Sequence, residues 1–182
     1  MSSPIPFFSL IEQWQQLKPR IMPKLEALLD KQQCIGGPAI ASFEKAFATF
    51  TGADHALSCS SGSTALWLAL LALDIKPGDI VLTTPFSFIA SSSEIYAHGA
   101  HPVYIDIEPI TMNMDPELLR VWLKENTHQE GNRTIHTLTN KPVTGILAVN
   151  IFGQCANYTA LRQLATEHHL WIIEDAAQSV GA

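Results

Sequence analysis

The sequence predicts an α/β fold in which a mostly parallel sheet is flanked by helices. Between residue 55 and the C-terminus, short apolar runs alternate with longer segments of helical pattern. The apolar runs lack a strict alternation of polar and apolar residues, which is typical of strands that are covered on both faces. Strands that alternate with helices in this way favour right-handed crossover units and hence a parallel sheet.

The elements are expected in a regular order along the chain. Strands are predicted at residues 55–60, 80–83, 102–106, 144–150 and 170–174, and helices at residues 38–50, 62–73, 88–98, 116–124 and 158–168. Asp115 before Pro116 is typical of a helix N-cap followed by a first-turn proline, and Asn157 is expected to cap the next helix. His168 and His169 end that helix, where the negative pole of the helix dipole favours positive charge.

The chain is expected to hold one domain preceded by a short segment. Residues 1–37 are predicted as an N-terminal lead-in segment, in which Pro19 and Pro23 break any single long helix. Residues 38–182 are predicted to belong to the N-terminal part of the α/β domain that follows. The polar stretch 126–142 contains Gly131 and Pro142 and is expected to be a surface excursion rather than a linker.

Composition restricts the classes of partner. The 182 residues are 47% apolar and only 15% charged, with a net charge of −6. An acidic chain without clustered Lys and Arg is not expected to bind nucleic acid or an anionic membrane. The longest apolar run, residues 65–73, is too short to span a bilayer. The shortage of charge predicts apolar surface that associates with other protein surface, and therefore low solubility of this chain alone.

Other sequence signals favour a cytoplasmic protein without a metal site. No basic segment followed by an apolar run is evident near the N-terminus, so no signal peptide is predicted. The three cysteines, Cys34, Cys59 and Cys155, show no paired spacing, which argues against a disulfide framework or a zinc ribbon. The seven histidines show no metal-binding spacing.

A small-residue segment at 59–66 joins a predicted strand to an apolar helix. Gly62, Ser63 and Thr64 stand where the helix begins, and free N–H groups at a helix N-terminus attract an anion such as phosphate. The alternative is an ordinary turn whose serines cap the helix. Neither a P-loop nor a Rossmann G-x-G-x-x-G motif is present.

Two further segments end predicted strands. Asp175 follows an apolar strand, and a carboxylate at the carboxyl end of a parallel sheet would need a cationic partner such as a metal ion or a protonated heterocycle. Taken alone, however, an acidic residue there more often caps the next helix. Phe88 follows another strand, where its ring could stack on a planar ligand, although a lone phenylalanine more often belongs to the core.

Considered together, these segments resemble the DegT/DnrJ/EryC1/StrS family of sugar aminotransferases, which depend on pyridoxal phosphate and have fold-type I. The resemblance runs from about Cys34 to Ala182 and depends on many motifs in one order. These are residues 36–38 with 43–44, 61–66, 76–79, 85–90, 99–103 with Asp106, 152–154, and 174–178.

The resemblance implies a role for each candidate residue. Gly62, Ser63 and Thr64 would hold the cofactor phosphate, and Phe88 would stack on the pyridine ring. Asp175 would pair with the pyridine nitrogen and keep it protonated, and this lets the ring act as an electron sink. Gln178 would hydrogen-bond the phenolic oxygen of the ring.

The chain also departs from the family pattern. The family commonly has Thr at Ser63, His at Asn150 and Pro at Cys155; the last two changes put substrate contacts near residues 152–154 in doubt. The lysine that binds the cofactor covalently lies downstream of the Asp-x-x-Gln motif in the family. All seven lysines of this chain precede Asp175, so the catalytic lysine is expected beyond Ala182 and the chain is expected to be an N-terminal fragment. The rest of the large domain and a small C-terminal domain would then be absent.

The resemblance implies transfer of an amino group from glutamate to a keto-sugar nucleotide by a homodimeric parent enzyme. Two alternatives stay open. Some relatives are sugar dehydratases in which histidine replaces the lysine. A non-catalytic binding or regulatory module is the alternative from another class.

Overall fold

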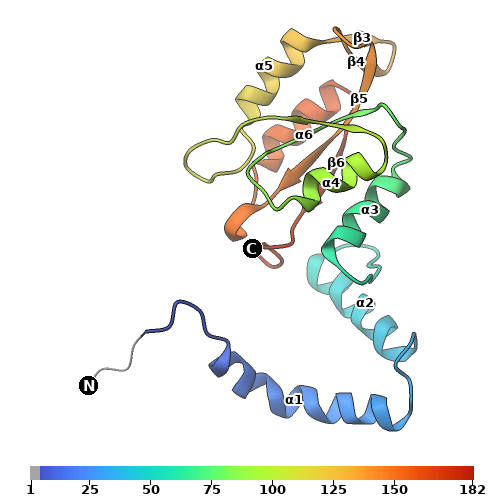
Figure 1. The fold of residues 1–182 in the computed structure, drawn as a ribbon, viewed down its shortest axis with the longest axis vertical. Helices are drawn as coiled ribbons and strands as arrows, with labels where there is room; N and C mark the ends of the chain where they lie inside the picture. The colour runs from blue at the N-terminus through green and yellow to red at the C-terminus, as the bar shows by residue number, and fades with distance from the viewer. Residues whose placement is uncertain (1–4) are drawn as a thin grey trace. The chain divides into compact units, whose positions relative to one another are not determined.

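The computed structural model describes residues 5–182, and the chain divides into two compact units, Met1–Ala56 and Leu57–Ala182 (Figure 1). The first four residues of the expected lead-in segment lie outside the described part. The predicted boundary between residues 37 and 38 stays a prediction. No helix within residues 5–182 has both the length and the apolar character needed to cross a membrane.

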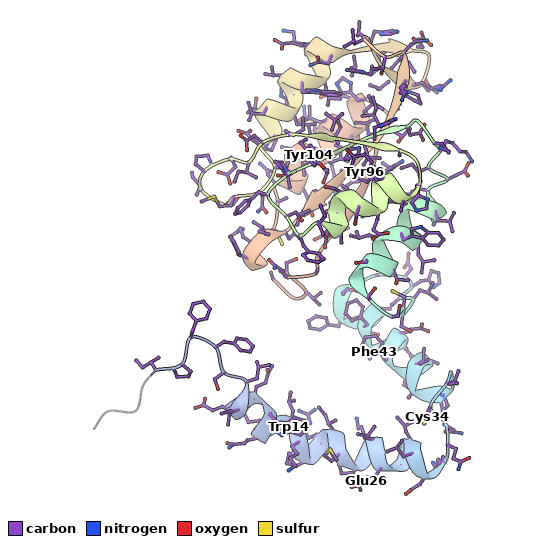
Figure 2. The ribbon with its side chains drawn as sticks, viewed as in Figure 1. Trp14, Glu26, Cys34, Phe43, Tyr96 and Tyr104 are labelled. Atoms are coloured by element: carbon purple, nitrogen blue, oxygen red, sulfur yellow. The ribbon has the colours of Figure 1, made fainter. Side chains whose placement is uncertain are left out.

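The first unit consists of two helices, α1 (Ile11–Asp30) and α2 (Pro38–Thr51). The expectation that Pro19 and Pro23 would break a long helix is wrong, because α1 contains both. The two prolines stand four residues apart and so remove N–H donors from the same side of the helix. Neither helix contains a buried residue, and Trp14 and Phe43 are about half exposed (Figure 2).

The second unit alternates strands with helices, as the sequence predicts. Its elements are α3 (Gly62–Ala72), β1 (Ile80–Thr83), α4 (Ala90–Ala97), β2 (His101–Tyr104), α5 (Pro116–Asn126), β3 (Thr127–Glu130), β4 (Arg133–His136), β5 (Lys141–Val149), the short 3-10 helix η1 (Ile151–Gly153), α6 (Tyr158–Glu167) and β6 (Trp171–Asp175). The predicted caps are confirmed. Asp115 accepts hydrogen bonds from the Glu117 and Leu118 amides at 2.7 and 3.3 Å, and Asn157 accepts one from the Ala160 amide at 3.2 Å.

The strands form one six-stranded sheet with the order β2-β1-β5-β4-β3, and β6 also pairs with β5. The four strands β2, β1, β5 and β6 run parallel, which confirms the expected fold class. The first residues of β5 pair with β4 and the later ones, from Gly145 to Val149, pair with β6. The sheet is therefore parallel throughout its central part.

Helices cover both faces of this sheet, and each face has its own core. On one face, Val81, Leu147 and Ile173 pack with side chains of α3 and α4. On the other face, Leu82 and Ile146 pack with side chains of α5 and α6. Successive strand residues point to opposite faces, so strands covered in this way are apolar throughout.

Two predicted segments differ from the structure. No strand forms at residues 55–60, where Leu57 is 82% exposed and provides no buried side chain to hold a strand in place. The stretch 126–142 is more ordered than a surface excursion, because it forms the antiparallel hairpin β3–β4 and the start of β5. Thr134 and Ile135 are buried in this hairpin, which explains why a polar segment with few apolar residues is held on the sheet.

Candidate functional site

The candidate site lies at the edge of the sheet where the parallel strands end. β1 ends at Thr83, β5 at Val149 and β6 at Asp175, and these ends share one edge because the strands are parallel. Helices α3 and α4 each lead into the start of the following strand at the opposite edge. Their N-termini are therefore directed toward the carboxyl ends of the strands, where open α/β sheets bind ligands.

Asp175 is held at this edge by two hydrogen bonds from uncharged donors. The Ser91 hydroxyl donates to Asp175 Oδ2 at 2.9 Å, and the Ala177 amide donates to Oδ1 at 3.2 Å. The alternative that Asp175 caps a following helix is wrong, because the chain forms turns and no helix after β6. No Lys, Arg or His forms an ion pair with Asp175 among the described residues.

The segment Gly62, Ser63 and Thr64 forms the first turn of α3. Ser61 is the N-cap residue, and its Oγ accepts a hydrogen bond from the Thr64 amide at 3.1 Å. The first N–H groups of a helix have no acceptor within the helix, so those of Gly62 and Ser63 stay available to an anion. The capping interpretation of this segment is thus confirmed, and it leaves the phosphate interpretation possible.

Phe88 lies in the loop between β1 and α4 with its ring 73% exposed. The alternative that this ring belongs to the core is therefore wrong. The Phe88 carbonyl oxygen accepts a hydrogen bond from the Ser91 amide at 3.2 Å. This bond connects the backbone of Phe88 to the first turn of α4.

Gln178 follows β6, and its side chain is hydrogen-bonded at one end only. Its Oε1 accepts from the Phe152 amide at 2.8 Å. Phe152 has left-handed backbone angles (φ 54°, ψ 21°), and a Cβ on Gly153 would lie 3.3 Å from the Gln178 carbonyl oxygen. Since the Phe152 amide needs an acceptor, the Nε2 group of Gln178 is the end that can donate to a ligand.

Asn150 is a residue of this site whose contacts the sequence did not reveal. It is fully buried, and its Nδ2 donates to Glu174 Oε1 at 2.7 Å and to Ser179 Oγ at 2.9 Å. Its Oδ1 accepts from the Ala156 amide and the Tyr158 hydroxyl, each at 2.9 Å. Burial, with the nearby Glu174 carboxylate second, raises the pKa of the Tyr158 hydroxyl, so this donor stays protonated.

Two more residues escaped the sequence analysis. Ser91 carried no signal beyond its place in a serine-rich helix. Thr83 ends β1 fully buried, and its Oγ1 is the one buried side-chain oxygen or nitrogen in the described part of the chain without a hydrogen-bond partner. Asn150 had one usable signal, because it stands where the family often has histidine.

The lysines of the second unit lie away from Asp175. Lys76 precedes β1 and Lys141 begins β5, which places both at the opposite edge of the sheet. Lys124 lies in the last turn of α5. Among residues 5–182, no three His, Cys, Asp or Glu side chains gather as a metal ion would require.

Two curated relatives each match nearly the whole of this chain. A pleiotropic regulatory protein of Geobacillus stearothermophilus is 36% identical over 98% of this chain and 44% of its own length. A UDP-2-acetamido-2-deoxy-3-oxo-D-glucuronate aminotransferase of Pseudomonas aeruginosa is 35% identical over 98% of this chain and 45% of its own length. The chain thus spans less than half the length of these relatives.

Solved structures share the fold. NtdA of Bacillus subtilis, with bound cofactor PMP, matches all of this chain and 38% of its own with 28% identity and a TM-score of 0.85. An E. coli GDP-4-keto-6-deoxy-D-mannose-3-dehydratase with bound PLP matches 86% of this chain and 38% of its own, with 25% identity and a TM-score of 0.72. The NtdA structure thus holds PMP, the amine form of the cofactor, and the dehydratase structure holds hydrated PLP. Residues 15–182 match the family model itself, and the chain belongs to the DegT/DnrJ/EryC1/StrS aminotransferase family.

Proposed function

We propose that this chain forms the cofactor cradle of a pyridoxal-phosphate-dependent enzyme that transfers an amino group from glutamate to a keto-sugar nucleotide. The observation that carries the proposal is Asp175, a carboxylate at the carboxyl edge of the sheet without a cationic partner among the described residues. A half-buried carboxylate is best stabilised by an opposite charge, and a protonated pyridine nitrogen provides one.

The other groups at this edge suit the same ligand. The amides of Gly62 and Ser63 can donate to a phosphate, and the exposed ring of Phe88 can pack on a flat heterocycle. The Gln178 Nε2 group can donate to a ring oxygen. Thr83 adds a buried hydroxyl without a partner at the carboxyl end of β1, at the same edge of the sheet. Donors for a phosphate, an acceptor for a ring N–H and an aromatic face are the three features that this cofactor needs.

Each residue would have a definite task in amino transfer. Asp175 would hold the proton on the ring nitrogen through its opposite charge, and Gln178 would orient the ring through its oxygen. The free amides of Gly62 and Ser63 would anchor the phosphate end, with Thr64 in the same helical turn, and Phe88 would cover one face of the ring against water. When bound, the cofactor supplies an electron sink for the negative charge that develops as the amino group is moved.

We also propose a homodimer and a cytoplasmic location, both from the family resemblance. The first unit supports association, because α1 and α2 contain no buried residue and expose apolar side chains along their length. The expected low solubility of the isolated chain has the same cause. Sedimentation over a range of concentrations tests whether the chain associates, and a monomer at high concentration would contradict the proposed association.

Two alternatives have specific support. The dehydratase among the structural relatives supports a dehydration reaction, and the Geobacillus relative named as a regulatory protein supports a regulatory role. The products distinguish them in the whole protein. Amino transfer gives a sugar that has gained nitrogen, dehydration gives one that has lost water, and a regulatory module gives neither by mass spectrometry.

Binding of pyridoxamine phosphate tests the cradle in this chain directly, because the amine form needs no lysine for attachment. Asp175→Asn should weaken its binding by about 10-fold or more, since a hydrogen bond to a charged group contributes about 1.5–3 kcal/mol. Asp115→Asn is the matched control, because asparagine also caps α5. Equal affinity of the Asp175→Asn variant and the unaltered chain would refute the assignment.

A further inference from the structure

A single side-chain hydrogen bond in the described structure connects the start of α4 to the end of β6. The Ser91 hydroxyl donates to Asp175 Oδ2 at 2.9 Å across 84 residues of sequence. Ser91 is fully buried in the first turn of α4, so water does not compete for its hydroxyl. A hydrogen bond from a buried hydroxyl to an ionised carboxylate is among the stronger ones in proteins.

Ser91 also has a defined donor of its own. Its Oγ lies 2.8 Å from the Ser87 Oγ. A hydroxyl has one hydrogen, and an ionised carboxylate can only accept. Because Ser91 gives its hydrogen to Asp175, the Ser87 hydroxyl must donate to Ser91. The direction of hydrogen bonding thus runs from Ser87 through Ser91 to the carboxylate.

The same residue is fixed to the aromatic ring at the site through the backbone. The Ser91 amide donates to the Phe88 carbonyl oxygen at 3.2 Å. Ser91 therefore has two hydrogen bonds to the loop that carries the ring, one from the Ser87 hydroxyl and one to the Phe88 carbonyl oxygen, and a third to the carboxylate. With the Ala177 amide on the other oxygen at 3.2 Å, Ser91 fixes the rotation of the Asp175 carboxyl group.

We propose that Ser91 is a positioning residue, which orients the Asp175 carboxylate toward the nitrogen of a bound pyridine ring and fixes it relative to Phe88. The inference rests on the proposed function and deepens it, because it names the residue that sets the strength of the contact between carboxylate and ring nitrogen. Ser91 itself touches no ligand in this proposal.

The test compares two ligands that differ at one atom. Pyridoxamine phosphate carries the ring nitrogen, and its 1-deaza analogue has a C–H in that position. The unaltered chain should bind the nitrogen-containing ligand more tightly. In Ser91→Ala this preference should fall by about 5- to 10-fold, because a net hydrogen bond contributes about 1–1.4 kcal/mol. Affinity for the deaza analogue should stay unchanged.

Three further variants complete the design. Ser91→Thr retains the hydroxyl and should retain most of the preference. Ser92→Ala is the matched control: it removes a neighbouring hydroxyl that is also buried in α4 but does not contact Asp175. It should change neither affinity. Circular dichroism verifies the fold of each variant, and Ser91→Cys, a weaker donor of similar shape, replaces Ser91→Ala if the alanine variant does not fold.

The outcomes separate this inference from the proposed function. If Ser91→Ala weakens both ligands equally, Ser91 acts through packing and the inference is overturned, as it is if neither affinity changes. If the unaltered chain shows no preference for the ring nitrogen, or does not bind pyridoxamine phosphate, then the proposed role of Asp175 fails and the inference fails with it. If the preference for the ring nitrogen is lost only in Ser91→Ala or Ser91→Cys, which lack the hydroxyl, the result supports both the inference and the proposed function.

Discussion

Gly145 on β5 lies directly against the indole ring of Trp171, its partner residue on β6. A Cβ added at Gly145 would come closer to three ring atoms of Trp171 than carbon atoms approach in proteins. The backbone angles of Gly145 are not left-handed, so the reason for glycine here is space and not conformation. The indole ring fills the space that a side chain at Gly145 would otherwise occupy. It packs across β5 and β6, the two strands that end at Val149 and Asp175.

Gly145→Ala should therefore destabilise the fold by about 2 kcal/mol, in the range found for overpacked cores. Urea unfolding should show a lower midpoint with an unchanged slope. Gly62→Ala is the control, because a Cβ there meets nothing within 4 Å. A second change, Trp171→Val, should recover part of the loss in Gly145→Ala, and a purely additive effect of the two changes would contradict the steric explanation.

Asn150→Ala should destabilise the chain by about 2–4 kcal/mol. The change leaves the Ala156 amide and the Tyr158 hydroxyl, both of which now donate to Asn150, without their acceptor. Tyr158→Phe removes one of these donors together with its need for an acceptor, so it should cost only about 1 kcal/mol. Thermal or urea unfolding distinguishes the two, and equal losses would show that the asparagine contributes through packing alone.

The sequence was sufficient for the parallel part of the fold because strands buried on both faces are recognisable as short apolar runs. The predicted strands at 80–83 and 170–174 match β1 and β6 within one residue, and the caps Asp115 and Asn157 are where they were expected. The strand prediction was wrong at residues 55–60, where the apolar run has no neighbouring strand. A local sequence pattern does not show whether a segment will pair with another strand.

The candidate site was only partly predictable for a related reason. The strand end at Asp175 and the helix start at Gly62 are local features, and local patterns indicate them. The contact of Ser91 with Asp175 joins residues 84 positions apart, and the hydrogen bonds of Asn150 join three separate segments. The packing of the whole sheet decides which of many hydroxyl and amide groups contacts a given carboxylate. No local sequence pattern indicates that choice.

Thr83→Val should leave the stability of the ligand-free chain unchanged or raise it by up to about 1 kcal/mol. The change replaces a buried hydroxyl without a partner by a methyl group of similar size, and an unsatisfied buried hydroxyl is costly. Urea unfolding without ligand provides the measurement. Thr84→Val is the comparison, because the Thr84 Oγ1 accepts a hydrogen bond from the Phe86 amide at 3.4 Å and its loss should be unfavourable. A clear destabilisation by Thr83→Val would show that its hydroxyl is hydrogen-bonded in solution.

His168, which follows α6, should make the fold less stable as the pH falls. The dipole argument favoured a charged imidazole there, but burial lowers its pKa from the usual 6.5, and the nearby Glu167 carboxylate only partly opposes this. Below about pH 6.5 the His168 imidazole binds a proton in the unfolded chain but not yet in the folded chain. The free energy of unfolding therefore declines until the imidazole of the folded chain is protonated too. His168→Gln should remove this part of the decline, seen as a flatter plot of unfolding free energy from pH 8 to 5. An NMR titration of the His168 ring with its midpoint at or above 6.5 would contradict the prediction.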